Sequence, residues 1–465
     1  SPRGARARFG RLQGYERVIT RPPGACPVAS LRLMTRAMNA PSFQTEMATG
    51  QRGKELLSGG DRFARRPGLV SRWLAPGFQS IINAVDAGLE RGSMLAHLPD
   101  GTTRLLGGRA PGFEARIDLK DWRALIRLAT SGSIGWYQAY EAGEWDSDDL
   151  VSLLAVMGDN ARALGDTARS SGPFRWAANF AHWLNRNSSK GSMRNIAAHY
   201  DLGNDFYGAW LDPSMTYSSA LGLSQNASEA EFEAAQRAKN EALIERLGLV
   251  DEHRLVLEIG CGWGTLAGQI AERLEESAVW AISLSREQLD YARQRQRDDI
   301  LFRHQDYRDT DGCFDAIASC EMVEALGRQY WPAFMDALAR NLETGRRAAI
   351  QYISMADDLF EDYAKSADFI QAYIFPGGLL IKTSEFRALA EARGLAWCDQ
   401  TDFGMDYAAT LRIWRERFAR AVAENRLPSG FDARFVRLWR YYLAYCEAGF
   451  RCRNVNVHQV TLIKK

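Results

Sequence analysis

The sequence lacks three features that would point to particular classes of protein. It has no apolar run of about eighteen residues, so no segment is expected to span a membrane. Its formal net charge is +1, which provides no strong field to attract nucleic acid. Its seven cysteines form no C-x-x-C pair, so neither a metal site nor a disulfide framework is indicated. A reducing, cytoplasmic compartment is therefore expected.

What remains is a chain of ordinary globular composition. It has 465 residues, of which 46% are hydrophobic and 25% are charged. This length predicts two or three domains. Residues 1–64 are rich in Arg, Gly and Pro, and we expect a disordered or leader-like arm there. A small α+β domain is expected over 65–168, a linker over 169–198, and a larger domain over 199–465.

The small domain is expected to begin with strands. Residues 92–108 indicate two short strands around a Pro-Asp-Gly turn, and residues 113–119 indicate a third. Helices are expected over 120–130 and 149–164, the second capped by Asp146-Ser147-Asp148.

The linker carries an aromatic face. Trp176, Phe180 and Trp183 recur at helical spacing, with Arg175 and Arg186 nearby. Packing against a neighbouring domain is the simpler interpretation. The alternative is a basic and aromatic face that contacts lipid head groups, which predicts peripheral membrane association.

From about residue 231 the pattern alternates between helices and strands. Strands are expected at 254–260, 278–284, 300–306, 314–320 and 346–354, with helices at 231–249, 266–276 and 286–298. This order predicts an α/β fold with a doubly wound, mostly parallel sheet. Such sheets bind ligands at the carboxyl ends of their strands.

The loop after the first of these strands reads Gly260-Cys261-Gly262-Trp263-Gly264. A dinucleotide site would need a glycine where Thr265 stands, and an acid near Ser283 at the end of the second strand. The spacing instead favours a ligand without a pyrophosphate that lies against bare backbone. Glu258 at the strand end is suited to a cationic amine. S-adenosyl-L-methionine has such an amine and no phosphate.

The segment "HYDLGNDFYGAWLDPSMTYSSA" (199–220) closely resembles the signature of the cyclopropane-fatty-acyl-phospholipid synthases, the family that includes the mycolic acid cyclopropane synthases. Further similar segments are "LEIGCGWGTLA", "ISLSREQLDYA", "QDYRD", "EMVEALG", "FIQAYIFPGG" and "WRYYLAYCEAGFR". The similarity covers about 199–463, and "GEWDSDDL" extends it into the small domain.

The resemblance implies a reaction. Members transfer the methyl of S-adenosylmethionine to a cis double bond of a lipid acyl chain, and the resulting carbocation loses a proton to a bound bicarbonate ion as a ring closes. The expected partner is an unsaturated phospholipid at a membrane surface, with no nucleic acid, and a homodimer stays open. Three alternatives stay open too: a methyl-branched or methylene product, a soluble small-molecule substrate, and a lipid-binding protein without catalysis.

The resemblance also implies which residues form the site. The cofactor shell is expected to contain Tyr217, Ser218, Glu258, Gly260, Cys261, Gly262, Gly264, Ser283, Leu284, Gln288, Asp306 and Tyr307. The catalytic positions are Ser219 and Ile353 through their backbones, and the side chains of Glu324, Gln351, Tyr407 and Cys446. Glu324 is expected to hold the proton acceptor, directly or through an anion. Cys446 matches a cysteine once regarded as a nucleophile, but methyl transfer to an alkene needs no covalent role for it.

Three positions depart from the family pattern. Ser219 stands where cysteine is usual, and Gln351 and Ala325 stand where histidines are usual. Glutamine can donate a hydrogen bond but cannot carry charge. An anion opposite Gln351 would exchange a contact worth about 1.5–3 kcal/mol for one worth about 1 kcal/mol. The use of bicarbonate is therefore open. Ring formation remains the favoured outcome.

Overall fold

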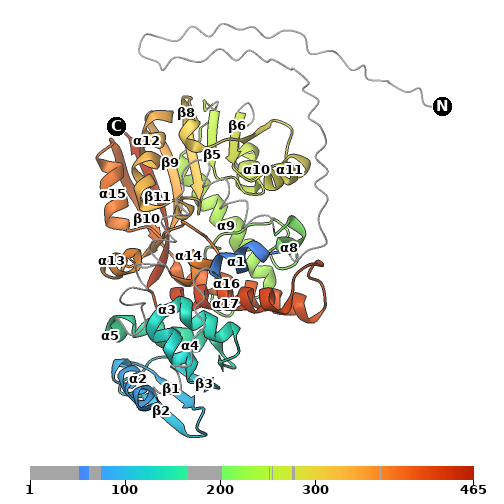
Figure 1. Cartoon of the computed structure of the whole chain (residues 1–465). Coiled ribbons are helices and arrows are strands. Elements are labelled where there is room, and N and C mark those ends of the chain that lie inside the picture. Colours follow the sequence, from blue (N-terminus) through green and yellow to red (C-terminus); the bar gives the residue numbers. More distant parts are fainter. Residues whose placement is uncertain are drawn as a thin grey trace, which may run out of the picture. The chain divides into compact units, whose positions relative to one another are not determined.

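The described part of the chain contains two β-sheets and the helices that pack on them (Figure 1). A computed structural model describes residues 52–61, 75–165, 202–250, 252–253, 255–274, 278–365 and 368–465. Most of the predicted arm and linker, including Trp176, Phe180 and Trp183, lies outside the described residues. The division into domains stays a prediction.

The amino-terminal sheet has the strand order β2-β1-β3-β4. Its strands are β1 (Ser93–His97), β2 (Thr103–Gly107), β3 (Glu114–Leu119) and β4 (Trp145–Asp146). β1 and β2 form the predicted hairpin, in which the Gly101 N–H donates to the Leu98 carbonyl at 2.9 Å. Gly101 has a φ of +83°, which a glycine adopts at little cost. β3 runs parallel to β1. The positions of β1, β2 and β3 agree with the prediction, and β4 is not among the predicted strands.

The helices of this region are α1 (Lys54–Asp61), α2 (Ala75–Gly88), α3 (Arg123–Glu141), α4 (Leu150–Asp159) and α5 (Ala161–Leu164). They differ from the prediction in several respects. α1 lies within the arm that is expected to be disordered or leader-like, α2 is not among the predicted helices, and the predicted helix over 149–164 is divided into α4 and α5. α3 continues well past residue 130, because the chain resumes its helix after a non-helical Gly132. The cap of α4 is Asp149 and not the preceding three residues, since its side chain accepts from the Ser152 N–H at 3.0 Å.

The larger sheet confirms the predicted α/β fold. Its strand order is β10-β11-β9-β8-β5-β6-β7. The strands are β5 (Leu255–Ile259), β6 (Ala278–Ser283), β7 (Ile300–His304), β8 (Phe314–Cys320), β9 (Leu342–Met355), β10 (Leu395–Asp402) and β11 (Val455–Lys464). β5 to β9 pair in parallel, as expected. β10 and β11 pair antiparallel and add to the sheet beside β9.

Helices connect and cover these strands. They are α8 (Asn204–Gly208), α9 (Glu229–Leu247), α10 (Thr265–Glu272), α11 (Arg286–Arg295), α12 (Trp331–Asn341), α13 (Asp357–Lys365), α14 (Phe369–Tyr373), α15 (Thr383–Glu391), α16 (Gly404–Ala423) and α17 (Ala433–Arg451), with the short 3-10 turns η3 (Tyr307–Asp309), η4 (Val323–Ala325) and η5 (Arg328–Tyr330). α9 begins with a capping box in which Ser228 and Glu231 satisfy each other's backbone N–H groups.

Helix α17 joins the amino-terminal region to the carboxy-terminal helices. It packs against α3, α4 and α16 (Figure 1). The ring of Tyr441 lies 5.1 Å from that of Tyr137, and both side chains are fully buried. At the edge of this contact the Arg434 guanidinium pairs with Glu141 at 2.8 Å. Residues far apart in the sequence therefore share one apolar core.

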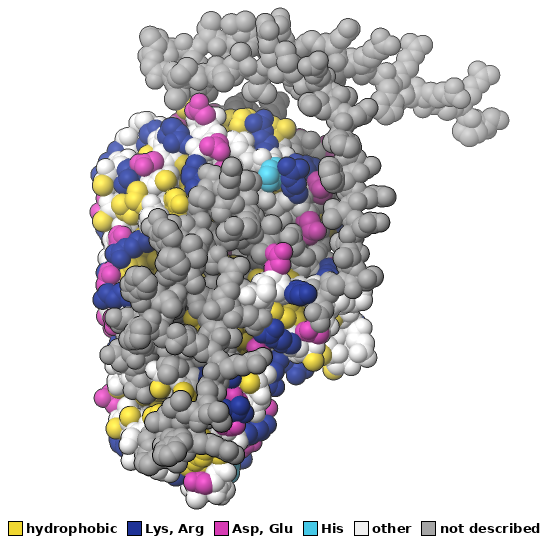
Figure 2. Space-filling view, viewed as in Figure 1, with side chains coloured by type: hydrophobic (Ala, Val, Ile, Leu, Met, Phe, Trp, Pro, Cys, Tyr) yellow, Lys and Arg dark blue, Asp and Glu magenta, His cyan; other side chains and the backbone are white. Residues whose placement is uncertain are grey.

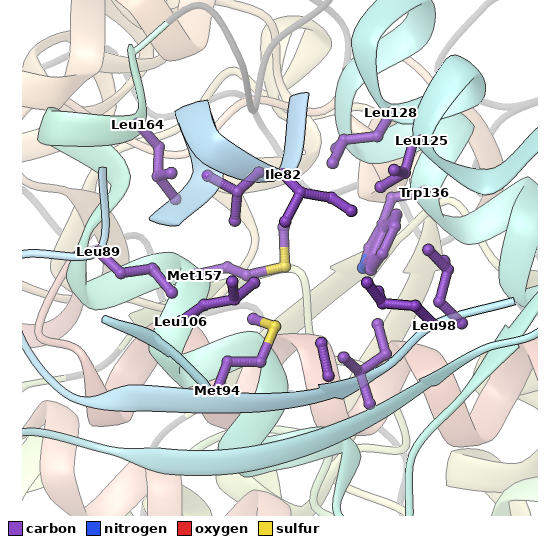
Figure 3. Close-up of a pocket in the computed structure, with 14 residues that line it drawn as sticks. Ile82, Leu89, Met94, Leu98, Leu106, Leu125, Leu128, Trp136, Met157 and Leu164 are labelled. Atoms are coloured by element: carbon purple, nitrogen blue, oxygen red, sulfur yellow. The ribbon is translucent and has the colours of Figure 1, made fainter. Parts of the chain in front are cut away.

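The amino-terminal region encloses a small apolar cavity of about 50 Å³ between its sheet and its helices. In Figure 3 the side chains of Ile82, Met94, Leu106 and Trp136 point into this space. All residues that line it are apolar. Leu128, Trp136 and Met157 also line a larger cavity described below, so they form a wall between the two.

The described surface is mixed in charge. Figure 2 shows Lys and Arg side chains interspersed with Asp and Glu on the face in view. Within the described ranges, none of the helices combines the length and the hydropathy required to cross a bilayer.

Candidate active site

The glycine loop after β5 forms the floor of the first cavity. Gly260, Gly262 and Gly264 have φ values of +83°, +51° and +85°, which favour glycine at all three positions. A Cβ atom at Gly260 would lie 2.5 Å from Met322, so this glycine allows close packing. A Cβ atom at Gly262 would meet nothing within 4 Å. Gly262 therefore presents bare backbone to open space.

This first cavity has a volume of about 160 Å³ and lies at the carboxyl ends of β5, β6 and β7. It is lined by every residue predicted for the cofactor shell except Gly264: Tyr217, Ser218, Glu258, Gly260, Cys261, Gly262, Ser283, Leu284, Gln288, Asp306 and Tyr307. Gly264 is instead the N-cap residue of α10. A Cβ atom built on it would lie 2.9 Å from the Phe302 ring, so this glycine allows close packing. The cavity also contains Lys239, which the sequence does not predict.

Glu258 fits the cation that the sequence predicts for it. The side chain is 2% exposed, and its Oε2 atom has no hydrogen-bond partner. Burial raises the pKa of Glu258 to about 8, although the charge of Lys239 lowers it in part. A buried carboxyl group with an unpartnered oxygen beside a cavity is suited to an incoming ammonium group.

Other residues of the cavity are held in place by short contacts. The Lys239 Nζ atom donates to Ser218 Oγ at 2.7 Å. Asp306 pairs with Arg308 at 2.6 Å and accepts from the Arg308 backbone N–H at 2.9 Å. Gln288 is oriented through Ser285, whose side chain caps α11. Hydrogen bonds and an ion pair within the chain thus hold these lining residues in place.

A second cavity, of about 410 Å³, adjoins the first. Its lining is mainly apolar and comes from α3 and α4 of the amino-terminal region, from the segment around α14, and from α16 and α17. Tyr217, Glu321 and Ala325 line both cavities. A group that passes from one cavity to the other must therefore pass these three residues.

Glu321 is the focus of the hydrogen bonds at this junction. Its Oε1 atom accepts from the Ser219 backbone N–H at 2.9 Å and from Gln351 Nε2 at 2.7 Å. Its Oε2 atom accepts from the Tyr407 hydroxyl at 2.7 Å. Ser219 and Gln351 are fully buried. Three of the predicted catalytic residues thus converge on a carboxylate that is not among the residues predicted from the sequence.

The orientation of Gln351 is set by a strand distant in sequence. Gln459 on β11 donates from Nε2 to the Gln351 Oε1 atom at 2.9 Å. Because Gln351 Oε1 accepts this bond, its Nε2 points toward Glu321. Arg246 contacts Gln459 Oε1 at 3.3 Å and extends the network.

Glu324 lies beside Glu321 and contacts another residue of the predicted site. It accepts a hydrogen bond from the Ile353 backbone N–H, and its Oε2 atom is buried without a partner. Burial, followed by the neighbouring charge of Glu321, raises the pKa of Glu324 to about 8. The five residues predicted to hold an anion do lie close together, but only Ile353 bonds to Glu324.

Cys446 on α17 lines the second cavity. Burial raises the pKa of its thiol far above the ordinary value, which opposes formation of a thiolate. This environment agrees with the expectation that Cys446 has no covalent role.

A signal for Glu321 does exist in the sequence. It follows directly on the buried strand β8 of a parallel sheet, where ligand sites form. Its φ of +48° is unusual for a residue other than glycine, but this cannot be read from the sequence.

The fold is that of a class I methyltransferase, and an apolar cavity adjoins the cavity at the carboxyl ends of its parallel strands. The sequence profile of the mycolic acid cyclopropane synthetases matches residues 187–460. The chain belongs to this family, and S-adenosylmethionine is its methyl donor.

Individual relatives agree with this placement. The tuberculostearic acid methyltransferase UfaA1 of Mycobacterium tuberculosis is 38% identical over 73% of this chain and 81% of its own length. The cyclopropane-fatty-acyl-phospholipid synthase of Escherichia coli is 33% identical over 76% of this chain and 88% of its own. The solved structure of the cyclopropane synthase MmaA2 of M. tuberculosis shares the fold, with a TM-score of 0.52 and 24% identity over 58% of this chain and 98% of that one.

Proposed function

We propose that this protein transfers the methyl group of S-adenosylmethionine to a cis double bond in the acyl chain of an unsaturated phospholipid, and that a cyclopropane ring results. The observation that carries the proposal is the junction of the two cavities. The smaller cavity has the glycine floor and the free Glu258 oxygen that the methyl donor needs. The larger one is mainly apolar and adjoins it at Tyr217, Glu321 and Ala325.

A lipid chain suits the larger cavity better than a polar metabolite does. Its volume of about 410 Å³ is lined largely by Leu, Met, Ile and aromatic side chains. An acyl chain gains free energy by leaving water for such a lining, at about 25 cal/mol per Å² of apolar surface. The E. coli relative is named a cyclopropane-fatty-acyl-phospholipid synthase, which supports the same substrate class.

The junction also suits a cationic intermediate on the substrate. Tyr217 and Tyr442 lie there with their hydroxyl groups 2.6 Å apart, and both line the larger cavity. Aromatic faces attract a cation, and an enclosed apolar site limits attack by water. These side chains would let the cation persist until a proton is removed.

A methyl-branched or methylene product is the second candidate. The same cation gives either product, and only the proton that is removed differs. Ala325 and Gln351 favour this candidate, because each stands where the resembled family usually has a histidine. The names of the relatives include both a methyltransferase and a cyclopropane synthase, so they fit both products.

We further propose that the protein works in the cytoplasm and meets its substrate by peripheral contact with a bilayer. An acyl chain must leave the membrane to enter the cavity, and the predicted aromatic face of the linker would serve that contact.

The test is lipid analysis of a host that lacks such an enzyme and expresses this chain. Unsaturated acyl chains should gain one CH₂ unit in mass, and upfield cyclopropane protons in the NMR spectrum would identify the ring. The same gain in mass with new methyl-branch or exocyclic methylene signals and without cyclopropane protons would establish the second candidate. Tight calorimetric binding of S-adenosylmethionine with no change in any lipid would refute the proposal and leave a soluble substrate. Failure to bind it would leave a lipid-binding protein.

A further inference from the structure

We propose that Glu321 itself accepts the proton from the substrate cation, so that a carboxylate built into the chain takes the place of a bound bicarbonate ion. This inference rests on the proposed methyl transfer to an alkene.

The first support is the set of donors around Glu321. The Ser219 N–H, Gln351 Nε2 and Tyr407 hydroxyl are three of the groups that the family resemblance assigns to an anion, and all three donate to this carboxylate. A carboxylate can accept about four hydrogen bonds. Oε1 already accepts two and Oε2 accepts one, so one acceptor position remains, on Oε2. The donors therefore hold the carboxylate and still leave a place for a proton.

The second support is location. The methyl group must pass from the cofactor cavity to the acyl cavity, so the reacting carbon has to lie where the two meet. Glu321 lines both cavities, whereas Glu324 lines only the larger one. Gln351 is fully buried behind Glu321, and an amide has no capacity to accept a proton at neutral pH.

The third support is the backbone. Glu321 has a φ of +48°, a conformation that costs a residue with a side chain and favours glycine. Its N–H donates to the Gln351 carbonyl at 2.9 Å, which fixes the strained residue in the sheet. Strain of this kind persists where the surrounding structure enforces it, and it often marks a functional side chain.

The surroundings of Glu321 and Glu324 affect the pKa values of these two carboxyl groups differently. Burial raises the pKa of Glu321, and the hydrogen bonds from Tyr407, Ser219 and Gln351 and the charge of Lys239 offset only part of that rise. Glu324 has one backbone donor, and burial and the charge of Glu321 raise its pKa to about 8. Two like charges in one buried site are avoided when one carboxyl group of the pair is protonated. Three donors on Glu321 against one on Glu324 favour the charge on Glu321, so the geometry makes Glu321 the base of the pair.

The step balances without a further reactant. In methyl transfer the π electron pair of the alkene forms a C–C bond to the methyl group while the S–CH₃ bond of the donor breaks. The electron pair of that bond stays on sulfur, S-adenosylhomocysteine remains, and the positive charge moves to the other alkene carbon. A C–H bond of the new methyl group, or of a neighbouring chain carbon, then breaks. Its electron pair forms the last bond of the ring or a new double bond, and the proton goes to Glu321 Oε2. That proton returns to solvent before the next turnover.

The experiment compares wild type with Glu321→Gln and Glu321→Gly on vesicles of dioleoylphosphatidylglycerol, in buffer stripped of carbon dioxide and with added bicarbonate or formate. Wild-type turnover should not depend on either anion. Glu321→Gln should lose about 10² to 10⁴ in rate, the usual contribution of a positioned base, and should keep its affinity for S-adenosylmethionine within about threefold. Glu321→Gly removes the backbone strain at this position and leaves the space of the carboxylate empty. The variant should therefore be inactive alone, and added bicarbonate or formate should partly restore its activity.

Glu324→Gln provides the comparison, because it replaces a neutral acid by a neutral amide. It should lose less than about tenfold. Wild-type activity that requires bicarbonate, or a Glu321→Gln variant within threefold of wild type, would overturn the inference and leave the proposed function intact. A folded Glu321→Gly that no anion restores would make Glu321 a positioning residue only. A wild type that converts no lipid at all would overturn the proposed function and the inference with it.

Discussion

At the scale of single residues, the site depends on atoms that lack partners. Gly262 faces space that a side chain could occupy, and Glu258 has one oxygen without a donor. A buried oxygen without a hydrogen bond costs free energy, and open space at a glycine forgoes packing contacts. Both features therefore favour a ligand at this place. Each leads to a measurement on cofactor binding alone, independent of the lipid.

Gly262→Ala should weaken binding of S-adenosylmethionine at least about tenfold, because the added methyl group takes space from the ligand. The φ of +51° means that part of any effect could come from backbone strain. Gly345→Ala is the matched control, since Gly345 has a φ of +79°, is exposed, and also has nothing within 4 Å of its built Cβ. Calorimetry should show wild-type affinity for Gly345→Ala. Equal losses in both variants would attribute the effect to strain.

Binding of S-adenosylmethionine should release a proton from Glu258 at pH 6.5 to 7. The pKa of about 8 keeps this carboxyl group protonated in the free protein, and an ammonium group favours its ionised form. Apparent affinity should therefore rise as the pH rises toward 8. Calorimetry in two buffers of different ionisation enthalpy counts the released protons. We expect a value near one for wild type and near zero for Glu258→Gln; equal values would place the ammonium elsewhere.

At the scale of elements, Glu321 is oriented through a strand that is distant in the sequence. β11 brings Gln459 beside β9, where it selects one of the two orientations of the Gln351 amide. That amide in turn donates to Glu321 at the end of β8. The three strands are neighbours in the sheet, although Gln459 is 108 positions from Gln351 and Gln351 is 30 positions from Glu321.

Gln459→Leu should lower kcat about fivefold or more, as expected for the loss of one buried hydrogen bond, with the affinity for S-adenosylmethionine unchanged. Without Gln459 the Gln351 amide can turn its oxygen toward Glu321, which repels the carboxylate. Thr461→Val is the control, because Thr461 is equally buried on β11 and also contacts Arg246. Both variants should lose stability, but only Gln459→Leu should lose turnover. A parallel loss of kcat in Thr461→Val would contradict this role.

These relations explain which parts could be predicted from the sequence. The alternation of strands and helices around β5 to β9 and the glycine loop are both local features of the sequence. The pattern and spacing of the residues therefore predict both. Gln459 and Glu321 cannot be predicted in this way. Gln459 acts only because β11 returns between β9 and β10, and Glu321 faces the junction only because its backbone is left-handed. The motif indicates Glu324 as the residue that holds the proton acceptor, and this stays a prediction; Glu321, three positions earlier, accepts the hydrogen bonds of three of the other predicted residues.

At the scale of the whole molecule, the larger cavity is completed by the amino-terminal region. Leu128, Trp136 and Met157 stand between it and the small apolar cavity of Figure 3. If an acyl chain occupies the larger cavity, this wall limits the length of chain beyond the reacting carbon.

Met157→Ala should join the two cavities and shift the preference toward longer acyl chains. In vesicles with equal palmitoleoyl and eicosenoyl chains, the ratio of products should move at least about threefold toward the longer one, since each added methylene in a pocket changes discrimination measurably. The cost in stability should be about 2–5 kcal/mol. Leu125→Ala is the control, because Leu125 lines only the small cavity. An unchanged product ratio in Met157→Ala would place the end of the acyl chain elsewhere.

The position of β11 also has a consequence for the order in which the chain folds during synthesis. Residues 455–464 form a strand that lies between β9 and β10 and pairs with both. While the ribosome is still making the preceding residues, β9 presents an open edge, and open edges are prone to pair with other chains. The sheet can be completed only after residues 455–464 emerge. Folding on the ribosome should therefore halt at an incomplete sheet, and chaperones that cover strand edges should bind nascent chains that stop before residue 455 more strongly than chains that include residues 455–464.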